Sequence, residues 1–157
     1  MKTRFSLENV LQEIKTLSYV TDAGNIAMAN VLGVELLRNV AEEIADIRNQ
    51  RIMKIMVHIL DPGQESPKHR DWVSPTATLG EWACLERWHL PIQTNEKAIW
   101  WDEKEGERHL PLGYWSGPMP YWRYHLVSNK GVEARIHIIV DLDSPKAVGK
   151  YEEQIER

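Results

Sequence analysis

The spacing of apolar residues changes near residue 50 and divides the chain into two parts. In the first part, apolar residues recur every three or four positions, which predicts two amphipathic helices. The first would be capped by Ser6 and carry its apolar stripe between Leu7 and Leu17. The second would run from about residue 26 to residue 49, after a turn at residues 22–25. Its predicted buried stripe consists of Val31, Val34, Leu37, Ala41, Ile44 and Ile47. We expect both helices to have a structural role.

After residue 50 the pattern predicts short β-strands, rich in β-branched and large apolar residues. The main predicted strands cover residues 51–60, 84–94, 98–101, 123–129 and 134–142. Alternation in the last strand places Arg135, His137, Ile139 and Asp141 on one face and apolar residues on the other. We therefore expect one α+β domain, residues 1–157. A helical scaffold (1–50) would pack against antiparallel strands (51–142) that close into a barrel or sandwich, followed by a polar tail (143–157).

Composition narrows the range of functions. The chain has 157 residues, 43% hydrophobic, with a net charge of -4, which gives no reason to expect a nucleic-acid surface. Its single cysteine, Cys84, excludes an internal disulfide and favours a reducing compartment. No apolar run reaches the length of a membrane span, and the first residues do not resemble a signal peptide. These features predict a cytoplasmic protein without a membrane or nucleic-acid partner.

The candidate chemistry begins at His69 and Asp71. Residues i and i+2 of an extended segment point to the same side, so these two side chains could reach one metal ion. Two histidines and one carboxylate on one face of a metal are typical of non-haem Fe(II) oxygenases. The tripeptide alone is a weak signal, and His125 is the natural candidate for the third ligand. Arg135 follows it by ten residues and could bind a carboxylate bidentately, although an arginine at the start of a strand can also lie at the surface.

A second basic pair comes from Arg87 and His89, which share one face of a predicted strand. They require either solvent or an anion, and this stretch alone leaves both open. All seven tryptophans fall between residues 72 and 122. We expect Trp72, Trp115 and Trp122 to line a substrate pocket, although aromatic residues of this kind also pack in cores.

Four motifs in this order resemble the aspartyl/asparaginyl β-hydroxylase family. They are His69-x-Asp71, Arg87-x-His89-Leu90-Pro91-Ile92-x-Thr94-Asn95, His125-x-Val127-x-Asn129 and Arg135-Ile136-His137-Ile138-Ile139-Val140-Asp141. The resemblance covers roughly residues 56–142 and excludes the N-terminal helices. It implies a double-stranded β-helix, that is, a jelly-roll or cupin-like barrel, and a dioxygenase that uses Fe(II), 2-oxoglutarate and O2. The implied reaction hydroxylates an amino-acid side chain and releases succinate and CO2.

The resemblance also implies a role for each motif. His69, Asp71 and His125 would bind and activate the metal, and Arg135 would pair with the C5 carboxylate of 2-oxoglutarate. Arg87 and His89 would help to bind the co-substrate carboxylates. The substrate would be an Asp, Asn or Pro type of residue in a peptide or protein, or a free amino acid. Two alternatives are a cupin-like binding or sensor domain without turnover and a cupin metalloenzyme without 2-oxoglutarate. The sequence gives no oligomeric state.

Overall fold

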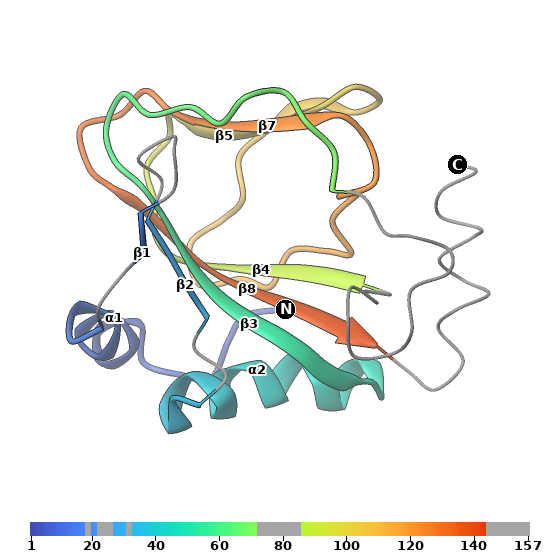
Figure 1. The fold of residues 1–157 in the computed structure, drawn as a ribbon. Helices are drawn as coiled ribbons and strands as arrows, with labels where there is room; N and C mark the ends of the chain where they lie inside the picture. Colours follow the sequence, from blue (N-terminus) through green and yellow to red (C-terminus); the bar gives the residue numbers. More distant parts are fainter. Residues whose placement is uncertain (18–19, 22–26, 31–32, 72–85, 144–157) are drawn as a thin grey trace.

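The strands form two antiparallel sheets that face each other, and the helices cover the outer face of the larger sheet (Figure 1). The computed structural model describes residues 1–17, 20–21, 27–30, 33–71 and 86–143. The elements in chain order are α1 (Leu7–Lys15), β1 (Val20–Thr21), β2 (Ala27–Asn30), α2 (Glu35–Arg48), β3 (Arg51–Leu60), β4 (Glu86–Gln93), β5 (Ala98–Asp102), β6 (Gly106–Arg108), β7 (His125–Asn129) and β8 (Arg135–Asp143).

The larger sheet has the strand order β1-β2-β3-β8-β4, and the smaller sheet has the order β6-β5-β7. The last strand, β8, therefore lies in the middle of the larger sheet, between β3 and β4. Its register places Asp141 opposite Lys54 on β3 and Arg87 on β4, and places His137 opposite His58. Residues that are directly opposite on antiparallel strands share a face, so one face of this sheet carries most of its polar side chains.

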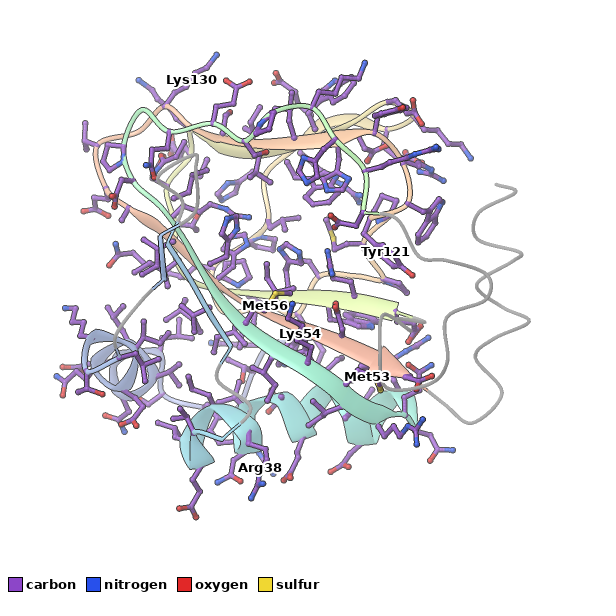
Figure 2. All side chains as sticks on the ribbon, viewed as in Figure 1. Arg38, Met53, Lys54, Met56, Tyr121 and Lys130 are labelled. Atoms are coloured by element: carbon purple, nitrogen blue, oxygen red, sulfur yellow. The ribbon has the colours of Figure 1, made fainter. Side chains whose placement is uncertain are left out.

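The two faces of β8 have the character that its alternation predicts. Its apolar residues, Ile136, Ile138, Val140 and Leu142, join the core cluster that includes the buried residues of both helices. The opposite face looks toward the smaller sheet: Leu60, which pairs with Arg135, clusters with Trp100 of β5 and Val127 of β7. Figure 2 shows Met56 on the side of β3 nearer the smaller sheet and Arg38 on the outer side of α2. The polar residues of β8, Arg135, His137 and Asp141, alternate with its apolar ones and therefore face the space between the sheets.

The first helix is confirmed, and the second is shorter than predicted. Ser6 caps α1 through a hydrogen bond from the backbone N–H of Asn9 (3.2 Å). The second helix begins at Glu35 rather than near residue 26, because Ala27–Asn30 forms a strand that pairs with β3. This pairing satisfies backbone groups at the edge of β3, a long-range effect that local periodicity does not register.

The shorter helix also changes the predicted buried stripe. Leu37, Ala41 and Ile44 are buried as predicted, but Ile47 is 55% exposed. Val40 and Ala45 are buried instead, so the stripe is centred between them and Ile47 falls beside it in the last turn. Val31 lies outside the described residues.

The predicted α+β class, with helices packed against antiparallel strands, is confirmed. The strand expected at residues 51–60 has those bounds, and the other long strands differ from their predicted bounds by at most two residues at each described end. Trp72, Cys84 and residues 144–157 of the predicted tail lie outside the described residues. Among the helices that the structure describes, none combines the length and apolar character that crossing a bilayer requires.

Candidate metal centre

The segment that precedes residue 72 runs antiparallel to β7 and brings two histidines together. His69 and His125 form a bridge in which each backbone N–H donates to the carbonyl of the other, at 3.0 and 2.7 Å. Their rings are 4.5 Å apart between centroids. The backbone N–H of Asp71 donates to the carbonyl of Tyr121 (3.0 Å), which fixes the next position of the segment. Two residues that are 56 positions apart in the chain are thereby placed next to each other.

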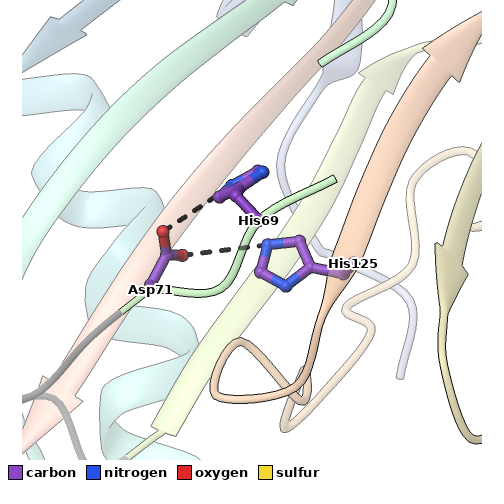
Figure 3. Close-up of side chains that lie close together, drawn as sticks. All are labelled: His69, Asp71 and His125. Carbon is purple, nitrogen blue, oxygen red and sulfur yellow. Dashed lines mark ion pairs between the residues drawn. The ribbon is translucent and has the colours of Figure 1, made fainter. Parts of the chain in front are cut away.

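His69, Asp71 and His125 form one donor set, as the sequence predicts (Figure 3). The Nε2 atom of His69 lies 3.7 Å from Oδ1 of Asp71, and Nε2 of His125 lies 3.9 Å from Oδ2. All three ligand atoms lie within 4.8 Å of one another. Two ligands about 2.1 Å from one ion and at right angles are about 3.0 Å apart. A small inward movement therefore suffices to close these side chains on a metal.

Hydrogen bonds orient both histidines for metal binding. Nδ1 of His69 is 2.6 Å from the carbonyl of Pro67, and Nδ1 of His125 is 2.8 Å from the carbonyl of Arg123. A carbonyl only accepts, so each Nδ1 carries a proton and each Nε2 keeps its lone pair for a metal. Burial lowers the pKa of His125, which also favours the neutral ring. Trp100 stacks on this ring at 4.4 Å and an angle of 13°; sequence reasoning did not assign it this position.

Arg87 links Asp71 of the donor set to a second carboxylate. Its Nη1 donates to Oδ2 of Asp71, while its Nε and Nη2 donate to the two oxygens of Asp141 at 2.7 and 2.9 Å. The guanidinium also lies 5.2 Å from the ring centre of Tyr121. The sequence predicts co-substrate binding by Arg87, and the structure places it beside the metal ligand. Asp141 was missed, although alternation in β8 had put it on this face.

Arg135 is a buried cation, 2% exposed, with no carboxylate within ion-pair distance among the described residues. Its Nη1 donates to Nδ1 of His58 (3.1 Å). Burial lowers the pKa of Arg135 to about 9, so it remains charged at neutral pH. Burial, followed by the charges of Arg135 and Arg87, lowers the pKa of His58 to about 3. His58 is therefore a neutral acceptor, and the charge of Arg135 remains available to an anion.

Two further histidines, His89 and His137, lie on the same side of the sheet. Their Nδ1 atoms are 3.1 Å apart, so one ring donates and the other accepts. Burial, followed by the charge of Arg135, holds both pKa values well below the usual value. Nε2 of His89 is buried and has no hydrogen-bond partner within the described ranges. Buried polar atoms are rarely left unpaired, so this atom is a candidate contact for a ligand. His137 was missed, although it shares its predicted face with Arg135.

The predicted substrate-pocket tryptophans occupy different environments. Trp115 is buried in the cluster between the larger sheet and the helices, and its Nε1 donates to Glu43 of α2 at 2.7 Å. This position favours a structural role instead of the predicted pocket. Trp122 is half-buried beside Tyr121, and its buried Nε1 has no partner in the part of the chain that the structure describes. Trp72 lies outside the described residues.

Comparison with known proteins identifies the fold. No protein-family model matches the chain, and no curated protein matches it in sequence. The viral collagen prolyl hydroxylase vCPH from Paramecium bursaria Chlorella virus-1, solved as a 2OG complex, is similar in structure with a TM-score of 0.64 and 13% identity. That match covers 90% of this chain and 93% of the viral chain. The chain has a cupin-like jelly-roll fold.

Two further solved structures that resemble the chain match it with lower TM-scores. A putative sugar phosphate isomerase from Acidithiobacillus ferrooxidans matches with a TM-score of 0.50 and 14% identity, over 85% of this chain and 72% of the other. A cupin 2 conserved barrel domain protein from Salinispora arenicola matches with a TM-score of 0.48 and 12% identity, over 98% of each chain. Identities this low show the fold alone, so the function has to be argued from the site.

Proposed function

We propose that the protein is an Fe(II)- and 2-oxoglutarate-dependent dioxygenase that hydroxylates an amino-acid side chain and releases succinate and CO2. One observation carries this proposal. A donor set of two histidines and one aspartate lies on the same inner side of the barrel as a buried arginine that has no carboxylate partner among the described residues. The ring of Trp100 stacks on His125 at 4.4 Å and packs edge-on against His89 at 5.8 Å. His89 in turn contacts His137, which shares its face of β8 with Arg135. The metal ligands and the free cation therefore belong to one site.

The donor set fits Fe(II). His69, Asp71 and His125 supply two imidazole nitrogens and one carboxylate oxygen, and all three come from one side. Protein ligands of this type leave other coordination positions open to small molecules, as in non-haem Fe(II) oxygenases. The carbonyls of Pro67 and Arg123, which accept from Nδ1 of each histidine, act as the outer hydrogen-bond partners that such sites use.

The surroundings of Arg135 fit a dicarboxylate. An uncompensated charge in a protein interior is costly. Among the described residues, the buried guanidinium of Arg135 contacts a neutral histidine and no carboxylate, which favours an anionic ligand. Arginine binds carboxylates through two parallel hydrogen bonds. Nε2 of His89, which has no partner in the described part of the chain, offers another polar contact on the same side of the sheet. We assign Arg135 to the far carboxylate of 2-oxoglutarate and His89 to its near end, with Arg87 beside them.

In this assignment the bound iron supplies oxidation by O2, and the protein binds, orients and shields the reactants. His69, Asp71 and His125 hold the metal, and Trp100 keeps the ring of His125 in place. Trp122 is the described residue that we assign to the substrate side. The substrate class is the one implied by the resemblance, an Asp, Asn or Pro type of residue in a peptide or protein or a free amino acid.

Calorimetric titration of 2-oxoglutarate into Mn(II)-loaded protein tests the co-substrate assignment. Arg135→Gln should weaken 2-oxoglutarate binding by about 100-fold, because losing one partner of a buried charge pair has effects of this size. Mn(II) binding and the circular dichroism spectrum should stay at parent values. Arg51→Gln is the matched control, since Arg51 pairs with Asp143 at the end of β8 (2.9 Å) and has no assigned contact with the co-substrate. Equal 2-oxoglutarate affinity in the parent and Arg135→Gln would show that the assignment is wrong.

A further inference from the structure

We infer that Asp141 is a positioning residue for the metal centre, acting through Arg87 on the ligand Asp71. This inference rests on the proposed metal site and adds a residue that does not itself reach the metal. Three groups form a chain across the site: the carboxylate of Asp141, the guanidinium of Arg87 and the carboxylate of Asp71.

The pair between Asp141 and Arg87 is fixed by the sheet. The two residues are directly opposite on β8 and β4, so their side chains emerge side by side on the same face. Asp141 is only 6% exposed, and both of its oxygens accept from Arg87, at 2.7 and 2.9 Å. A bidentate pair of this kind fixes the plane of the guanidinium as well as its position. The orientation of the Arg87 guanidinium is thereby set by Asp141 of β8, a strand in the middle of the larger sheet.

Asp71, in contrast, belongs to a segment outside both named sheets, and its side chain is 35% exposed. Its backbone is held by the hydrogen bond to Tyr121, but its carboxylate can still rotate about the side-chain bonds. Nη1 of Arg87 binds Oδ2. This contact leaves Oδ1 facing Nε2 of His69 at 3.7 Å. Oδ2 also lies 3.9 Å from Nε2 of His125. Arg87 therefore holds the Asp71 carboxylate in the orientation in which each oxygen faces one of the two histidines.

The charges explain why Asp141 is needed. Arg87 shared between two carboxylates leaves one net negative charge in the group, which favours a divalent cation. Without the charge of Asp141, Arg87 and Asp71 would form a neutral pair, and Arg87 would compete with the metal for the Asp71 carboxylate. Lys54, which lies opposite Asp141 on β3, brings the net charge of the row to zero, so that the row would be positive without Asp141. Removing the negative charge of Asp141 should therefore weaken metal binding through Arg87, which would lose its fixed orientation and bind the Asp71 carboxylate more tightly.

Titration with Co(II), followed by its visible absorption, tests this role without turnover. Asp141→Asn should bind Co(II) about 10- to 100-fold more weakly than the parent, the range found for outer-shell residues of metal sites. Asp143→Asn is the matched control, because Asp143 is also a buried aspartate of β8 that pairs with an arginine, Arg51. Its Co(II) affinity should stay close to the parent value. Asp141→Glu, which keeps the charge and displaces the carboxylate, should lie between the parent and Asp141→Asn.

A double-mutant cycle separates positioning from a general loss of stability. If Asp141 acts through Arg87, Asp141→Asn should cause no further loss of Co(II) affinity in an Arg87→Gln background. An equal loss in both backgrounds, or parent-like affinity in Asp141→Asn, would overturn the inference. A parent protein that binds no Co(II) would refute the metal centre itself. Failure of the positioning role and failure of the proposed function are thus distinguishable.

Discussion

At the level of single residues, the site depends on which atom each side chain presents. The backbone carbonyls behind His69 and His125 hold the protons on Nδ1 and leave Nε2 free, and Trp100 stacks on the second ring. Alternation and spacing predicted the donor set of His69, Asp71 and His125, and the structure brings these side chains together, because a bridge between two extended segments preserves the side to which alternate residues point. The contacts of Trp100 and Asp141 were not predictable, since they require the register of strands far apart in the chain.

Replacing either histidine of the donor set should remove metal binding. His69→Ala and His125→Ala are each expected to lose more Co(II) affinity than the about 10- to 100-fold typical of outer-shell substitutions, since each deletes a ligand. His109→Ala is the control, because His109 is exposed and its Nδ1 contacts the carbonyl of Ala98. Co(II) titration of the three variants measures this. Parent-like affinity in both ligand variants would mean that the metal binds elsewhere.

The position of Trp115 gives a second residue-level prediction. Trp115→Phe removes the hydrogen bond to Glu43 and leaves a largely buried carboxylate oxygen without this donor. The free energy of unfolding should fall by about 1–3 kcal/mol, the usual effect of an unpaired buried polar group, with no change in Co(II) or 2-oxoglutarate affinity. Urea denaturation and calorimetry together measure this. A loss of ligand affinity at unchanged stability would restore Trp115 to the substrate side.

At the level of elements, local periodicity predicted β3 and β8 closely because these strands have a consistent two-residue pattern. It failed at residues 27–30, where helical spacing continued but the backbone pairs with the edge of β3. Long-range strand pairing of this kind overrides local propensity. The same error shifted the predicted face of α2, so Ile47 was expected to be buried and is exposed.

The corrected face of α2 is testable by a pair of substitutions. Leu37→Ala should lower the free energy of unfolding by about 2–5 kcal/mol, because Leu37 is fully buried and its truncation leaves a cavity. Ile47→Ala should change it by no more than about 0.5 kcal/mol, as is usual for surface positions. Urea denaturation of both variants provides the comparison. Equal losses would show that Ile47 is buried, as periodicity predicted, and not exposed.

At the level of the whole molecule, the inner face of the larger sheet concentrates neutral histidines around the buried Arg135. His58, His89 and His137 all have pKa values lowered by burial and then by the charge of Arg135. Apolar side chains on the opposite face pack against the helices and form the core. One face of the sheet therefore stabilises the fold, and the other carries the candidate site.

This arrangement makes the stability of the metal-free protein depend on pH. A histidine with a lowered folded pKa stays neutral while the unfolded chain gains a proton below its ordinary value of 6.5. Its stabilising effect is present above that pH and is lost as the pH falls toward the folded pKa, which is about 3 for His58. Each such histidine should lower the free energy of unfolding by up to about 1.4 kcal/mol for every pH unit below its ordinary pKa.

Urea denaturation at pH 7 and pH 5 measures this dependence in a range above the ordinary pKa values of the carboxyl groups. The free energy of unfolding should be clearly lower at pH 5, and His58→Gln should reduce the difference between the two values. Unchanged stability across this range would mean that the three histidines are not held neutral in the folded protein.

The central claim is that one site holds Fe(II) and 2-oxoglutarate together, and anaerobic absorbance tests it most directly. When 2-oxoglutarate chelates Fe(II), a weak visible charge-transfer band results. Adding Fe(II) and 2-oxoglutarate to the purified protein should produce this band, and Asp71→Ala and Arg135→Ala should each abolish it. A folded parent protein that gives no band would contradict the account and favour a cupin-like binding domain without oxygenase activity.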